Sequence, residues 1–190
     1  MILPIRAFGD PVLRKVAKEI DKDYPNLQEL IDNMFETMYS ANGIGLAAPQ
    51  IGLDIRLFMV DVSPLADDED YEDIAEELKD FKKVFINAQI LDESGEEWKF
   101  NEGCLSIPDV REDVKRKSTI LIEYYDENFV KHTETFSDIR ARVIQHEYDH
   151  IEGILFTDHL SALKKKLVKG KLVKISQGEV GISYKMRFPK

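Results

Sequence analysis

Gln145-His146-Glu147-Tyr148-Asp149-His150 is the stretch from which the rest of the chain can be interpreted, because it contains the pattern H-E-x-x-H. On an α-helix, residues four apart lie on one face, about one turn from each other. His146 and His150 can therefore present two imidazoles to one metal ion. Glu147 lies where a carboxylate can reach a water on that metal. The pattern is typical of metal-assisted hydrolysis of amide-like bonds, and its bland alternative is a polar surface helix.

The residues around the motif favour a helix over 137–151 that buries the motif face. Ile139 and Val143 lie four apart and lead into His146 on the same side. Ser137 or Asp138 can cap the start, and Gly153 suits the end. Asp149 points elsewhere and needs a cationic partner if it is buried. Arg111 and Arg116 are the candidates.

A catalytic metal site normally has three protein ligands and an open position. The only cysteine, Cys104, is the candidate for the third ligand, because thiolates bind zinc and iron well. It lies in Glu102-Gly103-Cys104-Leu105-Ser106-Ile107-Pro108, where the flanking Gly and Pro indicate a shaped loop. A lone cysteine is also often a small buried packing residue, so both readings stay open at this point.

A third segment, Gly43-Ile44-Gly45-Leu46-Ala47-Ala48-Pro49-Gln50, follows a predicted helix over residues 27–39. Its two glycines permit backbone to come close to a ligand. The Gln50 side chain can donate a hydrogen bond to a developing oxyanion, or it can be an ordinary surface glutamine. If Gln50 is an ordinary surface glutamine, the segment is only a tight connection between a helix and a strand.

Taken together, the three segments resemble the peptide deformylase family, which carries G-x-G-x-A-A-x-Q, E-G-C-L-S and H-E-x-D-H in this order. The chain has GIGLAAPQ at 43–50, EGCLS at 102–106 and HEYDH at 146–150. The resemblance covers roughly residues 1–165. It implies removal of the N-formyl group from the initiator methionine of new polypeptides. It also implies ferrous iron as the metal, with zinc, nickel or cobalt as alternatives.

The resemblance also implies a role for individual residues. In the family, Cys104, His146 and His150 would bind the metal, and Glu147 would be the general acid/base. Oxyanion binding falls to the side chain of Gln50 and the backbone N–H of Leu105. Gly45 would pair with the extended substrate. For the apolar pocket that takes the methionine side chain, the candidate wall residues are Ile44 and Val143, with Arg111 at the entrance.

The expected fold is α+β: mostly antiparallel strands packed around a central metal-binding helix, with a second long helix nearer the N-terminus. Strands are predicted at 55–60 and 84–91, a hairpin at 119–125 and 129–136, a short helix at 11–17, a late helix at 161–175 and a late strand at 180–188. We expect one catalytic domain over 1–165 with an acidic insertion at about 63–83, and a basic extension over 166–190.

Charge is unevenly distributed in this chain of net charge −10. Residues 67–80 hold nine acids and one lysine, and a solvated loop and short helix are expected there. Residues 164–190 hold nine Lys or Arg and one acid. Polycations bind nucleic acid through its phosphates, so the ribosome is a candidate partner of this segment, with a merely solvated face as an equal alternative.

One cysteine excludes an intramolecular disulfide, and a thiolate ligand requires a reducing compartment. No apolar run has the length of a signal peptide or a membrane span, so a cytoplasmic protein with no membrane partner is expected.

Two rival functions share the H-E-x-x-H pattern. One class of metallopeptidase has the extended pattern H-E-x-x-H-x-x-G-x-x-H. This chain matches the glycine of that pattern at Gly153, but it has Phe156 where the last metal ligand should be. Another peptidase class would need Glu179 as its ligand. A closed structural metal site would need Asp158 or His159 as the fourth ligand and would leave Glu147 without a role.

Overall fold

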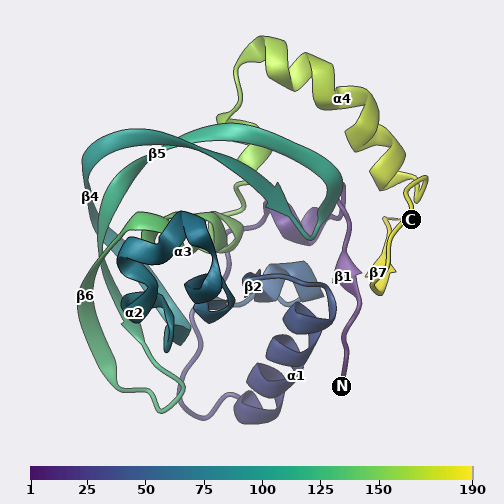
Figure 1. Cartoon of the computed structure of the whole chain (residues 1–190). Helices are drawn as coiled ribbons and strands as arrows, with labels where there is room; N and C mark the ends of the chain where they lie inside the picture. The colour runs from purple at the N-terminus through teal and green to yellow at the C-terminus, as the bar shows by residue number, and fades with distance from the viewer. Residues whose placement is uncertain (190) are drawn as a thin grey trace.

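A computed structural model describes residues 1–189 as an α+β fold built on an antiparallel sheet (Figure 1). The sheet has five strands in the order β2-β3-β4-β5-β6. Their bounds are β2 (Gly45–Ala47), β3 (Leu57–Asp61), β4 (Lys82–Cys104), β5 (Ile107–Tyr125) and β6 (Lys131–Ser137). The predicted strand at 55–60 corresponds to β3, and the predicted hairpin is β5 with β6, paired from Thr119 with Ser137 to Tyr125 with Lys131.

Helix α3 (Asp138–Ile151) carries the H-E-x-x-H motif, and the curved strands β4, β5 and β6 pass around it (Figure 1). Asp138 has a φ of 55° and its carboxylate accepts a hydrogen bond from the Arg140 N–H at 3.0 Å, so it caps the helix start. The helix ends before Gly153, whose φ of 72° favours glycine. Both ends agree with the prediction.

Strands β4 and β5 form one long hairpin, and this corrects the two shorter strands predicted at 84–91 and 119–125. The hairpin pairs continuously to Cys104 with Ile107, apart from bulges, so the predicted loop at 102–106 is instead the end of a strand and a tight turn. Residues 91–99 are almost all exposed, and bulges at Ile90/Asp92 and Ser94/Glu97 let the hairpin curve. This curvature carries Cys104 across to α3.

Helix α1 (Leu27–Ser40) packs its buried face, which includes Ile31, Met34 and Met38, against one side of the central strands. It leads through Gly43 into β2 and then into the 3₁₀ turn η2 (Ala48–Ile51). The predicted helix at 27–39 is confirmed. Strand β2 is an edge strand of the sheet, so one side of its backbone remains available for pairing.

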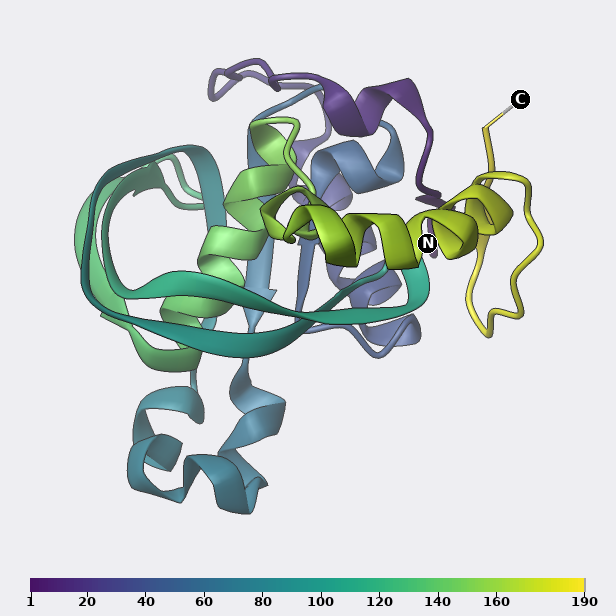
Figure 2. The same ribbon diagram turned by 90° about the horizontal axis from the view of Figure 1, so that it is seen from above.

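The acidic run forms a small projection of two 3₁₀ segments, η3 (Ser63–Asp67) and η4 (Glu69–Ile74), and the helix α2 (Ala75–Leu78) (Figure 2, lower part). Leu78 is buried, and Leu65, Tyr71 and Ile74 are partly buried against the same apolar cluster. The acidic side chains are mostly exposed. The expected solvated loop with a short helix is therefore present, with the α-helix confined to Ala75–Leu78.

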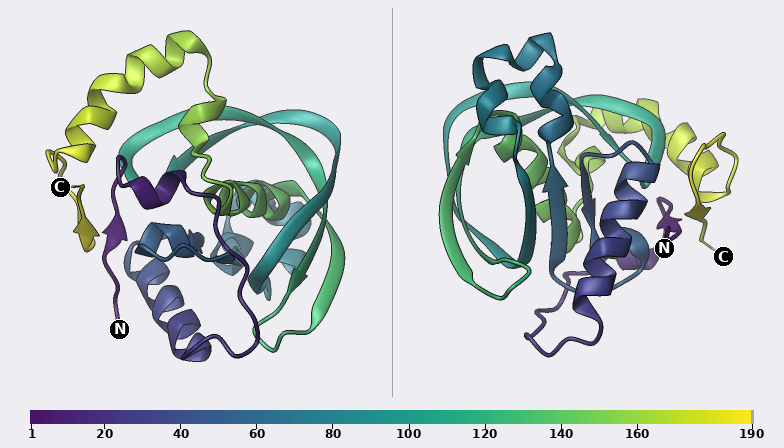
Figure 3. Two further views of the ribbon diagram at one scale, coloured as in Figure 1. Left: turned by 180° about the vertical axis from the view of Figure 1, so that it is seen from behind. Right: turned by 60° about the horizontal axis from the view of Figure 1, so that its bottom comes forward.

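The two ends of the chain meet in a second, two-stranded sheet, which is parallel: β1 (Ile5–Arg6) with β7 (Met186–Arg187) (Figure 3). Helix α4 (Ala162–Ser176) leads to it, close to the predicted 161–175. The strand predicted at 180–188 is reduced to the two residues of β7. The helix predicted at 11–17 is a 3₁₀ turn, η1 (Pro11–Arg14). Across residues 1–189, no helix has the length and apolar character needed to cross a membrane.

Candidate active site

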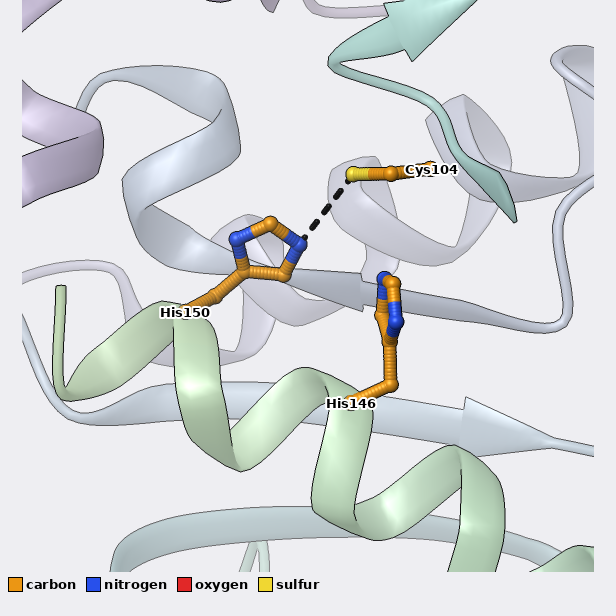
Figure 4. Close-up of side chains that lie close together, drawn as sticks. All are labelled: Cys104, His146 and His150. Carbon is orange, nitrogen blue, oxygen red and sulfur yellow. Dashed lines mark hydrogen bonds between the residues drawn. The ribbon is translucent and has the colours of Figure 1, made fainter. Parts of the chain in front are cut away.

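Cys104, His146 and His150 meet at one point between the end of β4 and α3 (Figure 4). One ligand atom from each residue lies within 4.8 Å of the others, and the Sγ of Cys104 is 3.3 Å from the Nε2 of His150. Within residues 1–189, no other group of three His, Cys, Asp or Glu side chains converges in this way. Thiolate and imidazole are ligands that zinc and iron accept, so this trio fits a divalent transition metal.

Glu102 fixes the orientation of His146, and the sequence analysis missed it as a site residue. Its Oε2 lies 3.0 Å from the Nδ1 of His146, so that the Nε2 of His146 is free to face a metal. Glu102 is 4% exposed and also forms salt bridges with Arg116 and Arg142, at 2.7 Å and 2.9 Å. Burial alone would raise the pKa of Glu102, but hydrogen bonds from His146 and Arg116 lower it well below its ordinary value. Glu102 is therefore a fully charged carboxylate.

The two histidines have opposite pKa shifts. Burial opposes the charged form of His146, but hydrogen bonds with Cys104 and Glu102 outweigh it and raise its pKa well above 6.5. Burial and the nearby charges of His146 and Arg116 lower the pKa of His150 well below 6.5. The cluster of thiol, imidazole and carboxylate thus favours one positive charge at its centre. A bound cation meets this preference without a proton.

Glu147 points into the same cleft and is 4% exposed. Its Oε2 is buried with no hydrogen-bond partner among the described residues, and burial raises its pKa to about 7. A buried carboxylate without a partner is costly. The unpaired oxygen therefore indicates that a water or substrate group belongs beside Glu147.

The amide of Gln50 is aimed by its own backbone turn. Its Oε1 accepts a hydrogen bond from the Ala47 N–H at 2.8 Å, which turns the Nε2 toward Cys104 and Ser106. The Nε2 is 3.5 Å from the Cys104 Sγ and 3.3 Å from the Ser106 Oγ. Gln50 is 2% exposed, so the reading of an ordinary surface glutamine is wrong.

Apart from His150, which is 1% exposed and lies behind the lining, these groups line a cleft of about 520 Å³. Its walls include the sequence-predicted residues Ile44, Gly45, Gln50, Cys104, Leu105, Arg111, Val143, His146 and Glu147. Arg111 also donates hydrogen bonds to the side-chain oxygen and the backbone carbonyl of Asn101, at 3.0 Å and 2.6 Å. It is Arg116, at 2.8 Å, that pairs with Asp149, so Arg111 was the wrong alternative for that role.

Two further residues of the site carried no clear sequence signal. Arg142, on α3, is 1% exposed and bonds Glu102 together with the carbonyls of Trp98 and Val114. A buried arginine one turn before His146 could have suggested an acidic partner. Tyr184 lines the cleft from the C-terminal segment and donates a hydrogen bond to the carbonyl of Leu105 at 2.7 Å. Nothing local to the sequence placed it there.

Three of the residues that the rival functions need, Phe156, Asp158 and His159, make other contacts. Phe156, at the last position of the extended peptidase motif, is buried and stacks on His146 with ring centroids 6.1 Å apart. His159 bonds Asp149 at 2.8 Å, and Asp158 pairs with Arg14. Neither joins the cluster of Cys104, His146 and His150.

Known proteins similar to this chain match it over nearly its whole length. A family model described as polypeptide deformylase matches residues 2–166. The peptide deformylase of Christiangramia forsetii is 66% identical over 190 residues, which cover 100% of this chain and 97% of that protein. That of Flavobacterium johnsoniae is 62% identical over 189 residues, 99% of this chain and 96% of that protein.

Solved structures show the same likeness. The crystal structure of a peptide deformylase from Legionella pneumophila has a TM-score of 0.79 at 36% identity, over 94% of this chain and 98% of that one. The structure of peptide deformylase from Thermotoga maritima has a TM-score of 0.73 at 37% identity, over 85% of this chain and 99% of that one. With the three motifs in one cleft and these matches along its length, the chain belongs to the polypeptide deformylase family.

Proposed function

We propose that Cys104, His146 and His150 bind one divalent metal ion with which this peptide deformylase hydrolyses the N-formyl group of newly made polypeptides. One observation supports the proposal above the others: the three ligand atoms converge within 4.8 Å beside the unpaired, buried Oε2 of Glu147. When bound, such an ion supplies Lewis acidity, which polarises a carbonyl and lowers the pKa of water.

Glu147 is the proposed proton carrier. Glu147 lines the cleft with a buried, unpaired Oε2, and burial raises its pKa, which favours a carboxyl group that can take up and release a proton. As carboxylate it accepts a proton from the attacking water. As acid it returns that proton to the amine that leaves as the formyl C–N bond breaks. Formate and a free N-terminus are the products.

Gln50 and Leu105 are the proposed donors to the oxyanion. The Gln50 Nε2 is held toward Cys104 by the Ala47 N–H, and Leu105 follows Cys104 directly in the turn. Fixed donors are effective because they need no reorganisation as charge develops, and each is typically worth about 2.7–4 kcal/mol.

The substrate is proposed to lie along β2, with its backbone paired to Gly45 and its methionine side chain against Ile44 and Val143. Strand β2 is at the sheet edge, so an extended peptide can add to it. Arg111 lines the same cleft and lies where it can meet the following residues.

Ferrous iron is the proposed physiological ion, with zinc, nickel or cobalt as substitutes, because one thiolate and two imidazoles accept all four. A thiolate ligand is stable in a reducing compartment, which supports a cytoplasmic location. The ribosome is proposed as a partner of α4, where Lys165, Lys166 and Lys169 are exposed.

The test is release of formate from a formyl-methionyl peptide by the metal-loaded protein. One formate and one free amine per substrate are expected, with no cleavage of the same peptide lacking the formyl group. Cleavage of internal peptide bonds without formate would instead assign the site to a peptidase.

A further inference from the structure

The turn between β4 and β5 is tied to both ends of the chain. The carbonyl of Ser106 accepts a hydrogen bond from the Phe8 N–H at 2.8 Å. The carbonyl of Leu105 accepts one from the hydroxyl of Tyr184 at 2.7 Å. Consecutive carbonyls of the turn that follows Cys104 are thus held by the N-terminal and the C-terminal segments.

The C-terminal segment is itself fixed where it meets the turn. The carbonyls of Lys185 and Arg187 accept hydrogen bonds from Ile5 and Ala7, both at 2.9 Å, in the pairing of β1 with β7. The half-buried ring of Tyr184 packs on the same apolar cluster as Leu105 and Met186. The hydroxyl therefore has a defined position, and residues 181–184 form one wall of the cleft.

Two side chains hold the turn around Leu105. The Gln50 amide contacts the neighbours of Leu105, Cys104 and Ser106. The Tyr184 hydroxyl holds the peptide plane that follows Leu105. Peptide groups are planar, so only the φ and ψ torsions of Leu105 separate this plane from the plane that carries the Leu105 N–H.

We propose that Tyr184 is a positioning residue for the deformylase reaction: its hydroxyl fixes the peptide after Leu105 and so aims the Leu105 N–H into the cleft. This inference rests on the role proposed above for Leu105. Oxyanion donors act over a narrow range of distance, about 2.7–3.1 Å. A turn that can tilt loses transition-state stabilisation while it still binds the ground-state substrate.

Tyr184→Phe tests the proposal, because it removes the hydroxyl and keeps the ring. We expect kcat on a formyl-methionyl tripeptide to fall about 2- to 10-fold, the worth of one ordinary hydrogen bond, with KM within about twofold of the wild type. Metal content should stay the same. Amide hydrogen exchange at residues 104–107 should become faster, measured in the metal-loaded and the metal-free protein. Ser176→Ala is the matched control, because it removes a hydroxyl-to-carbonyl hydrogen bond of 2.7 Å in the same terminal region, away from the turn.

An unchanged kcat in Tyr184→Phe would overturn the proposal, whatever the exchange rates. So would a lower kcat that is accompanied by metal loss, or one matched by Ser176→Ala, since either result would assign Tyr184 a structural role only. The hydrogen-exchange measurement does not depend on turnover. Failure of the proposed function would appear separately, as absence of formate release by the wild-type protein in the same assay.

Discussion

Glu147 occupies the space that a side chain on Gly45 would need. A Cβ atom at position 45 would lie 2.8 Å from both the Cγ and the Cδ of Glu147 and closer still to its Oε1. Separations below 3.0 Å force a group to move, and Glu147 is the movable partner because it lies at the open cleft while Gly45 is paired in β2.

Gly45→Ala should therefore displace the Glu147 carboxylate and reduce kcat about 10²-fold, the typical cost of misplacing a reacting group by about 1 Å. Bound metal should remain, because no ligand moves. Gly170→Ala is the matched control: nothing lies within 4 Å of its new methyl group. It should keep full activity and gain up to about 1 kcal/mol of stability, because alanine is the better helix former. Near-normal turnover by Gly45→Ala would show that the Glu147 position is not critical.

Glu147→Gln should lower kcat about 10²–10⁴-fold, because an amide cannot accept the proton. The side chain keeps its size, so the fold and the metal content should be those of the wild type. Metal analysis and thermal unfolding check this before kcat is compared. A metal-loaded Glu147→Gln protein with near-normal formate release would remove Glu147 from proton transfer.

Cys104→Ala should remove both bound metal and activity if the thiolate is a ligand. A packing role predicts a different result: metal content stays intact and only stability falls. The wild-type protein carries a related liability, because ferrous iron beside a thiolate is open to oxidation by air. Purification under nitrogen should therefore preserve activity that purification in air loses, and loading with zinc, nickel or cobalt should abolish the difference. A full equivalent of metal in Cys104→Ala would exclude the thiolate as a ligand.

Asp126 begins the turn between β5 and β6 and should make stability depend on pH. Burial would raise its pKa, but a hydrogen bond with His132 at 2.8 Å and two from the backbone N–H groups of Asn128 and Val130, each at 2.9 Å, lower it. A lowered folded-state pKa stabilises the fold above the unfolded value of about 3.9, and that contribution disappears as the pH falls through the folded value.

Asp126→Asn should thus lower the free energy of unfolding at pH 7 by about 1 kcal/mol. The gap to the wild type should narrow as the pH falls below about 4. Urea unfolding at several pH values measures this difference in the free energy of unfolding. Glu127→Gln, at the exposed neighbouring residue, is the control for the loss of charge alone. A gap that stays constant with pH would show that the charge of Asp126 contributes nothing.

The sequence predicted what depends on local spacing and missed what depends on distant contacts. His146, Glu147 and His150 share one helix face by periodicity alone, and Asp138 and Gly153 mark its ends. The long β4–β5 hairpin was not predicted, because residues 91–99 are almost all exposed and show no apolar alternation. Its length is nevertheless what brings Cys104 to α3. Glu102, Arg142 and Tyr184 were missed because their contacts join distant parts of the chain: Glu102 meets Arg142 and His146, 40 and 44 residues later, and Tyr184 meets Leu105 across 79 residues.

Helix α4 carries a basic face of exposed lysines. Lys164 forms a salt bridge with Glu112 at 2.8 Å, so its reversal would also disturb the packing of α4 on β5. Lys165, Lys166 and Lys169 are exposed and make no salt bridge with a described residue. These three are therefore the cleaner probe of whether α4 binds ribosomal RNA.

Changing Lys165, Lys166 and Lys169 to Glu should leave turnover of a short formyl-methionyl peptide intact, because none of them lines the cleft. Co-sedimentation with ribosomes at low salt should weaken, since phosphate contacts supply affinity that falls as salt rises. Reversal of Lys22, Lys79 and Lys99, which are exposed and make no salt bridge with a described residue, changes the net charge by the same amount elsewhere on the surface, and it should have little effect. If both triple variants lose binding equally, only overall charge matters. If neither does, the lysines of α4 serve as a solvated face and the ribosome is not their partner.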